Sequence, residues 1–428
     1  MNGRKQTHYT EPSLNSNKGG SECRYMECFI FASEDCKSLT PMRKLIILFV
    51  ILSMFCWSCN LRQQKLGVTG DLIKIDISKN YPQKKIRLVD VADVEYVPLE
   101  TTKNVLIDRY ASLHYVSEKY IIVTERGGGD IFVFNRKGKI VTHISHKGRG
   151  PEEYNVMSSV VFDEINEEIF VFDLPSTGRI LVYSITGEYR RTLKHSTDLD
   201  PMAYNFDEET MLVYDINGLN NNNYNKKPYL FLSKKNGDSI SSLNINLPIR
   251  HPIKVIDRFT DSSGKDWYTS NNFAIPHRRH DGQDFVIADV SSDTIYRLNK
   301  NKDLIPFIVC TPSVHSTDPH LICIPFLITE KFVFLYITTL DYVSLQKGRV
   351  PPVKTLMYEF ESGEISRVDY MTAALYVNTL QKNIEVRMID AVLLTDLYKA
   401  KKLSGELEQL ATTLDEEDNP VVMIAKFK

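Results

Sequence analysis

Short apolar runs separated by turn residues dominate the chain from about residue 71 to about residue 386. These runs are rich in Val, Ile, Phe and Tyr, and Gly, Asn, Asp and Pro stand between them. Continuous or alternating apolar runs of this length are typical of β-strands, and helical spacing is nearly absent before residue 386. The pattern predicts an all-β fold for most of the chain.

Two consecutive stretches repeat the same order of elements: strand, turn, strand, glycine turn, strand. The first comprises 120–124, 130–135, Gly138 and 140–144, and the second comprises 168–172, 179–183, Gly187 and 189–193. Gly138 and Gly187 are 49 positions apart. A glycine suits this place because a tight turn between two strands requires positive φ. Repeats of about 40–50 residues with three or four strands predict a β-propeller.

Weaker copies of the unit follow along the chain. They comprise 211–214 with 229–232, 285–288 with 294–298 and 305–308, and 332–336 with 355–360. A pair of β-sandwiches is the alternative, but it would leave the 49-residue spacing unexplained. We therefore expect one propeller over residues 71–428, with the first strands at 71–77 and 85–89.

The C-terminal part departs from the strand pattern. Residues 388–414 carry apolar side chains at helical spacing, and Ser404 and Gly405 divide them into two helices. We expect a helical insertion at about 386–415, followed by a closing strand at 420–427. Pairing of a terminal strand with the first blade removes two free sheet edges, and either this strand or 71–77 is expected to do so.

The one long apolar run, Leu45–Phe55, follows a basic segment that begins at Met42 and precedes Ser58 and Cys59. A run of about 11 apolar residues is too short for a membrane span, which takes about 20, but it suits an export signal. We interpret residues 42–58 as a signal peptide. Residues 1–41 are polar and aperiodic, and we interpret them as a spurious leader before a true start at Met42.

The end of this signal resembles the lipobox of bacterial lipoproteins, with Ser58 before Cys59. Cys56 and Trp57 depart from the small or aliphatic residues usual in that motif. The resemblance implies a lipid on Cys59 and a spacer at 59–70. An ordinary secretory signal is the alternative.

Charge and cysteine content narrow the possible functions. The 52 basic and 54 acidic residues leave a net charge of −2, which argues against a nucleic-acid binder. Cys23, Cys28 and Cys36 lack the paired spacing of a structural metal site. After Cys59 only Cys310 and Cys323 remain, either as two thiols or as one disulfide.

The sequence contains no G-x-S-x-G, H-E-x-x-H, Walker or G-x-G-x-x-G motif. The acidic pairs Glu152–Glu153 and Glu167–Glu168 fit a solvated surface better than an acid–base pair. His277–Asp281 and His315–His320 are the best candidate metal ligands. Neither has helical support, and Arg278 and Arg279 would repel a cation. We interpret both as exposed loops and assign no catalytic, cofactor or metal residue.

Three segments carry a resemblance to a known family. They are 90–102, the Gly-Arg-Gly-Pro-Glu-Glu-Tyr segment 148–154, and 418–422. Together they resemble the six-bladed β-propeller lipoproteins of Bacteroidetes, which are similar in architecture to NHL-repeat propellers. The resemblance covers about residues 70–428 and implies a six-bladed fold, with no activity assigned to most members. Segment 148–154 is explained by turn geometry and a buried Tyr154 without any ligand.

Three functions compete. The first is a lipid-anchored, non-catalytic module that binds an unknown protein or glycan. The second is a hydrolase or lactonase with a divalent metal ion in the central channel, whose ligands would come singly from several blades. The third is a component of an envelope complex that is contacted through the helices at 388–414. We expect an outer-membrane lipoprotein that faces the periplasm, with surface exposure as the alternative, because no acidic run follows Cys59.

Overall fold

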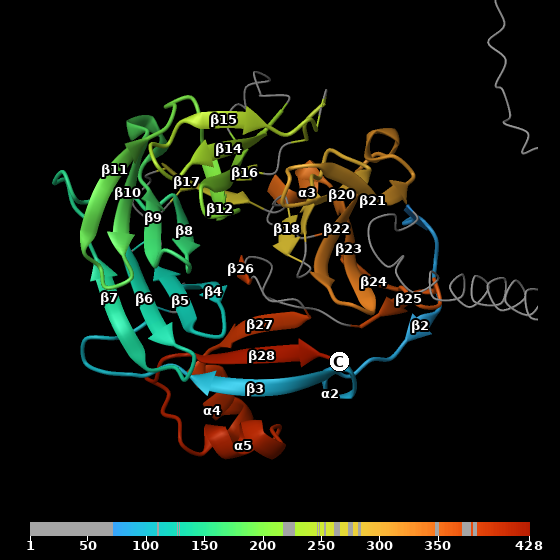
Figure 1. The fold of residues 1–428 in the computed structure, drawn as a ribbon. Coiled ribbons are helices and arrows are strands. Elements are labelled where there is room, and N and C mark those ends of the chain that lie inside the picture. Colours follow the sequence, from blue (N-terminus) through green and yellow to red (C-terminus); the bar gives the residue numbers. More distant parts are fainter. Residues whose placement is uncertain are drawn as a thin grey trace, which may run out of the picture. The chain divides into compact units, whose positions relative to one another are not determined.

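Six β-sheets follow one another along the chain and form the blades of a six-bladed β-propeller, as the sequence predicted (Figure 1). The computed structural model describes residues 72–428 except 109–110, 126, 128, 217–226, 246, 248, 252–253, 261–265, 273–276, 281–283, 347–350, 370–377 and 380–382, and the side chains of 175, 252–283, 345–346 and 378–379. The predicted leader, signal peptide, spacer and Cys59 therefore lie outside the described residues.

Four consecutive antiparallel strands form each of the first five blades, and the sixth has three strands. Blade 1 comprises β4 (Ser112–Val116), β5 (Tyr120–Glu125), β6 (Asp130–Asn135) and β7 (Ile140–Ser145). Blade 2 comprises β8 (Ser159–Asp163), β9 (Glu168–Phe172), β10 (Arg179–Ser184) and β11 (Tyr189–Lys194). Blade 3 comprises β12 (Pro201–Asn205), β13 (Thr210–Asp215), β14 (Tyr229–Ser233) and β15 (Ser239–Ser242).

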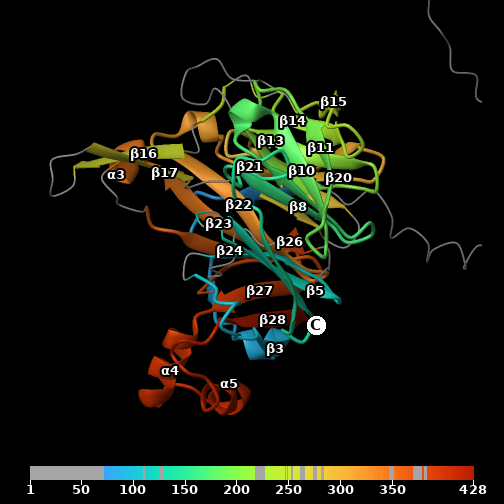
Figure 2. The same ribbon diagram turned by 90° about the vertical axis from the view of Figure 1, so that its left-hand side faces the viewer.

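The remaining blades follow the same order. Blade 4 comprises β18 (His277–His280), β19 (Phe285–Ala288), β20 (Thr294–Leu298) and β21 (Leu304–Thr311). Blade 5 comprises β22 (His320–Ile328), β23 (Phe332–Leu340), β24 (Lys354–Glu359) and β25 (Ile365–Val368). Blade 6 comprises β27 (Ile384–Ile389), β28 (Val421–Phe427) and β3 (Ala92–Pro98). Between blades 3 and 4, β16 (Lys254–Thr260) and β17 (Asp266–Asn272) form a separate hairpin, which lies beside α3 (Tyr342–Gln346) (Figure 2).

This strand order defines two faces of the ring. The turns between second and third strands and the crossings from one blade to the next lie on one face, which we call the crossing face. The turns between first and second and between third and fourth strands lie on the other, the hairpin face. Gly138 and Gly187 occupy hairpin-face turns with φ of 77° and 85°, as the repeat predicted.

The chain closes the ring by pairing both of its ends in blade 6. Strand β28 pairs antiparallel with β27 on one side and with β3 on the other, so that Val422 lies opposite Val97. The side chain of Asn419, only 2% exposed, donates to the carbonyl oxygens of Glu100 and Val105, both at 2.8 Å. The segments 90–102 and 418–422, two of those that carry the family resemblance, are thus neighbours in space.

The N-terminal segment also covers the outer edges of blades 4 and 5. Strand β1 (Ile73–Asp76) pairs in parallel with β21, and β2 (Gln83–Lys84) pairs in parallel with β25. The strand expected at 85–89 is wrong, because the chain has already left β25 there and turns into the short helix α2 (Leu88–Val91) on its way to β3. Another short strand, β26 (Asn378–Thr379), pairs in parallel with β4 at the inner edge of blade 1.

Two helices connect β27 to β28 on the hairpin face, α4 (Ala391–Lys399) and α5 (Gly405–Ala411). The insertion expected from about 386 begins later, because Met388 pairs with Val422 within blade 6. Ser404 occupies the N-cap position of α5 without a capping side-chain hydrogen bond. Among the described residues no helix is long and apolar enough to cross a membrane.

The apolar core lies between neighbouring blades. Ile122 of blade 1 and Val171 of blade 2 belong to one fully buried cluster, and Phe170 of blade 2 and Val213 of blade 3 belong to the next. Because each sheet buries both faces, its strands are continuous apolar runs rather than alternating ones. This packing holds the turns and crossings at fixed positions on the two faces.

Candidate functional site

Acidic side chains stand at the crossing-face end of the second strand in three consecutive blades: Glu125, Asp173 and Asp215. Each accepts a backbone N–H from the segment that enters its own blade. Asp108 donates to Glu125, Asn155 and Val156 donate to Asp173 Oδ1 at 2.8 and 3.1 Å, and Asp200 donates to Asp215 Oδ1 at 3.1 Å. These carboxylates therefore fasten the incoming chain, because an unpaired backbone N–H would otherwise be buried there.

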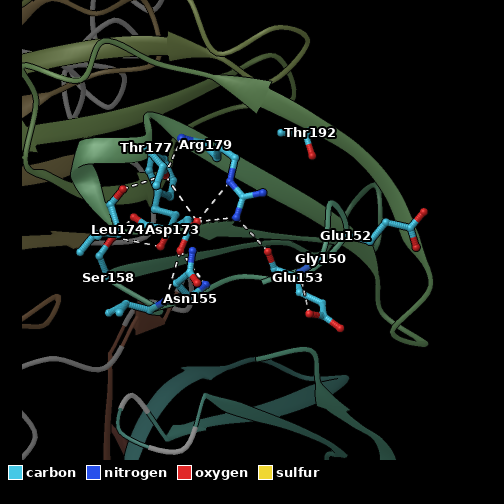
Figure 3. Close-up of polar contacts among 12 residues, drawn as sticks. Gly150, Glu152, Glu153, Asn155, Ser158, Asp173, Leu174, Thr177, Arg179 and Thr192 are labelled. Atoms are coloured by element: carbon cyan, nitrogen blue, oxygen red, sulfur yellow. Dashed lines mark hydrogen bonds and ion pairs between the residues drawn. The ribbon is translucent and has the colours of Figure 1, made fainter. Parts of the chain in front are cut away.

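The arrangement in blade 2 adds a buried ion pair (Figure 3). Arg179 Nη2 lies 2.7 Å from Asp173 Oδ2, whose side chain is fully buried, and it also donates to the carbonyl oxygen of Glu153 at 2.9 Å. Burial acts to raise the pKa of Asp173, but the Arg179 guanidinium and backbone N–H groups outweigh it and hold that pKa below its ordinary value.

Segment 148–154, the third segment of the family resemblance, is fixed by contacts within the protein. Glu153 Oε2 accepts the backbone N–H of Gly150 at 2.8 Å, Tyr183 donates to the carbonyl of Glu152 at 2.7 Å, and the buried Tyr154 hydroxyl donates to the carbonyl of Gly129. The Arg179 bond to Glu153 ties the segment to the Asp173 pair. These contacts describe a rigid crossing between blades 1 and 2.

Aliphatic side chains are exposed beside this polar scaffold. Val156 and Leu174 flank the Asp173 pair on the crossing face and are 44% and 41% exposed. Ile249, in the crossing from blade 3 to blade 4, is 53% exposed. The Glu153, Asp173 and Arg179 side chains bind the protein itself. The exposed aliphatic side chains are available for contact with another molecule.

Three histidines meet farther around the same face. The ring of His251, 7% exposed, lies 4.0 Å from the ring of His320 between centroids, and its Nε2 is 3.1 Å from His315 Nδ1. His315 Nε2 is 3.1 Å from the carbonyl oxygen of Ser291, and His320 Nδ1 is 2.9 Å from that of Val314. Burial first, and then the neighbouring His320 and His315, lower the pKa of His251 to about 4.

The interpretation of both histidine segments as exposed loops needs correction. His315 is exposed, but His320 begins β22 and is partly buried against His251. His277–His280 form strand β18 of blade 4 because they pair antiparallel with 285–288, and their side chains lie outside the described residues. His251 was missed because it is 64 residues from His315 and only the crossing between blades brings it close.

The remaining candidate residues lie apart from one another. Glu168 pairs with Arg191 on blade 2, and Glu167 accepts a hydrogen bond from Tyr120. Cys310 and Cys323 are free thiols, so they form no disulfide in this structure. Among the described residues no group of three or more His, Cys, Asp and Glu side chains is arranged to hold a metal ion.

Comparisons with known proteins identify a family and similar solved structures. The family model described as "Domain of unknown function (DUF4934)" matches residues 72–316. A crystal structure of a Bacteroides fragilis protein, described as exported, has 14% sequence identity and a TM-score of 0.57, with 84% of this chain and 100% of that one covered. A DUF4221 family member from Bacteroides vulgatus has 10% identity and a TM-score of 0.44, with 79% and 97% covered. No curated protein matches the sequence.

Proposed function

The chain belongs to the DUF4934 family, a family of Bacteroidetes propellers of unknown function. We propose that it is an exported, lipid-anchored propeller. In this proposal its crossing face binds another protein and catalyses no reaction. One observation carries the proposal. Asp173 and Asp215 accept backbone N–H groups of the protein itself, while Val156, Leu174 and Ile249 are exposed.

The chemistry of the exposed groups favours a protein over a glycan. Exposed aliphatic side chains rimmed by polar groups are typical of protein interaction sites. Sugar recognition would draw on exposed aromatic rings and free polar groups, and the polar groups beside Val156 and Leu174 are engaged with the scaffold. A glycan partner is therefore the alternative outcome of the cross-linking experiment described below.

The cellular localisation of the protein is part of the same proposal. The run Leu45–Phe55 followed by Ser58 and Cys59 supports export and lipid attachment at Cys59. A Bacteroides fragilis protein with a similar fold is described as exported, which supports export of this protein. We place the protein on the periplasmic side of the outer membrane, held there by its lipid.

Site-specific photo-cross-linking in the native host tests the binding face. A benzophenone amino acid is placed at Leu174, and the matched control is placed at Ile165, which is 72% exposed on the hairpin face of the same blade. We expect one discrete protein adduct from position 174 and none from position 165. A glycan adduct at 174 would replace the protein partner with a glycan, and equal labelling from both positions would contradict a binding role for this face.

Metabolic labelling with a fatty-acid analogue tests the anchor separately. Cys59→Ala is expected to lose the label and to leave the membrane fraction, whereas Cys56→Ala retains both. Unchanged membrane partitioning of Cys59→Ala would refute the anchor without bearing on the binding face.

A further inference from the structure

The histidine cluster joins three separate segments of the crossing face. His251 ends the described part of the crossing from blade 3 to blade 4, Ser291 lies in the turn between β19 and β20, and His315 lies in the crossing from blade 4 to blade 5. The backbone N–H of His251 donates to Ser291 Oγ at 2.8 Å, and His315 Nε2 reaches the Ser291 carbonyl. Ser291 is thus held by both histidines.

The hydrogen-bond partners of the rings determine which nitrogens donate. A carbonyl oxygen only accepts, so His315 carries its proton on Nε2 and His320 carries its proton on Nδ1. His315 Nδ1 is then an acceptor, and His251 Nε2 must donate to it. The bond between His251 and His315 needs one facing nitrogen without a proton, so it is lost when His251 Nε2 and His315 Nδ1 both carry protons.

The surroundings offer little to stabilise a positive charge. The buried Arg250, the chain neighbour of His251, donates to the Tyr214 hydroxyl and to the Asp215 carbonyl oxygen in blade 3. The nearby carboxylates face other groups: Asp289 Oδ1 accepts from the Ser291 backbone N–H, and Asp293 Oδ1 accepts from the Val314 backbone N–H. Asp318 is exposed. None of these carboxylates forms an ion pair with the three rings, as far as the described residues extend.

We propose that His251, His315 and His320 form a proton-sensitive latch, which holds the three segments together when the rings are neutral and releases them in mildly acidic solution. A proton added to the buried His251 ring would face the neighbouring His315 and His320 rings, and the His251–His315 bond is lost when both facing nitrogens carry protons. The latch acts on the conformation of the crossing face, and it does not depend on which partner, if any, that face binds.

The size of the effect follows from linkage. A histidine that titrates near 6.5 when unfolded and near 4 in the closed state binds its proton mainly when the latch is open. The closed state is therefore most stable above about pH 7, and it loses stability relative to the open state as the pH falls from 6.5 towards 4. At pH 5 the opening equilibrium of the segments should rise about 30-fold over its value at pH 7.5.

Hydrogen exchange measured at pH 7.5 and pH 5.0, corrected for the intrinsic rate at each pH, tests the latch in the full chain. We expect residues 311–320 to lose protection about 30-fold at pH 5.0 while strand β13 keeps its protection. Equal protection of 311–320 at both pH values would overturn the proposal. Loss of protection throughout the propeller would do the same, because it would show global acid unfolding.

Two variants assign the response to the cluster. His251→Gln retains a donor for His315 Nδ1 but cannot take up a proton, so its exchange at pH 5.0 should stay within about threefold of that at pH 7.5. His143→Gln changes a histidine that pairs with Asp130 on blade 1, 2.8 Å away, and should respond like the wild type. His251→Asn serves if His251→Gln does not fold, because it also cannot take up a proton. A wild-type response in both cluster variants would overturn the proposal.

Discussion

Lys234 Nζ lies 2.6 Å from Asp163 Oδ2 in an ion pair that joins blade 3 to blade 2, with side chains only 5% and 1% exposed. Lys234 also donates to the carbonyl of Asp207, and Asp163 Oδ2 also accepts from Asn166 Nδ2 at 2.8 Å. The pair lies on the hairpin face, where it fixes the position of two neighbouring sheets. Removing one partner would leave the other charge buried and uncompensated.

Lys234→Met is therefore expected to lower the free energy of unfolding by about 3–5 kcal/mol, measured by urea denaturation at pH 7. Lys399→Met is the control, because Lys399 pairs with Glu416 at the surface with both side chains more than half exposed. The control should unfold at the wild-type urea concentration. Equal midpoints for the two variants would show that the buried pair contributes nothing to stability.

Asp173→Asn tests the carboxylate that fastens the crossing into blade 2. The change removes the charge that pairs with Arg179 and weakens the bonds from Asn155 and Val156, at an expected cost of about 2–3 kcal/mol at pH 7. The pKa of Asp173 is lowered in the folded state, so its contribution is complete above about pH 4 and is lost as the pH falls through the folded value.

The difference in stability between wild type and Asp173→Asn should accordingly narrow as the pH is lowered from 5 to 2 in thermal melts. Glu152→Gln, in the same segment but exposed, should match the wild type throughout. A difference that does not change with pH would show that the cost comes from lost packing and not from the charge.

The repeat was readable from the sequence because its causes are local. Gly138 and Gly187 mark turns that need positive φ, and the apolar runs between them are strands buried on both faces. An acid at the end of the second strand was also within reach, since Asp173 and Asp215 both directly follow the buried run of that strand. The role of this acid could not be predicted from the sequence, because the backbone N–H groups that it accepts come from another part of the chain.

Contacts that depend on distant segments escaped prediction. Strand β2 is two polar residues, Gln83 and Lys84, and only the exposed edge of β25 makes them a strand. Met388 fits the helical spacing of the residues after it, but its pairing with Val422 places it in a sheet. His251 has no local signal of function, because its neighbours in the cluster are supplied by a different blade.

Gly138→Ala should destabilise the propeller more than Gly363→Ala. Both glycines have positive φ, 77° and 70°, so each substitution strains the backbone by about 1–2 kcal/mol. A Cβ at Gly138 would also lie 2.1 Å from the carbonyl oxygen of Pro98, which is backbone of β3 and cannot move freely, whereas at Gly363 the nearest atom is 3.9 Å away. Urea unfolding should show an additional loss of about 1–3 kcal/mol for Gly138→Ala. Equal losses would mean that blade 6 yields to the clash without cost.

Cys310 and Cys323 should react slowly with iodoacetamide in the folded protein at pH 8. The hydrogen bond to Cys310 and burial together raise the pKa of the Cys323 thiol, and the thiolate is the reactive form. We expect alkylation of both cysteines, followed by peptide mass spectrometry, to be at least about tenfold slower in buffer than in urea at the same pH. A cysteine introduced at the exposed Ser241, as Ser241→Cys, should react at similar rates in both. Recovery of a Cys310–Cys323 disulfide peptide, or rapid alkylation of the folded protein, would contradict two free thiols, of which Cys310 is buried and Cys323 partly buried.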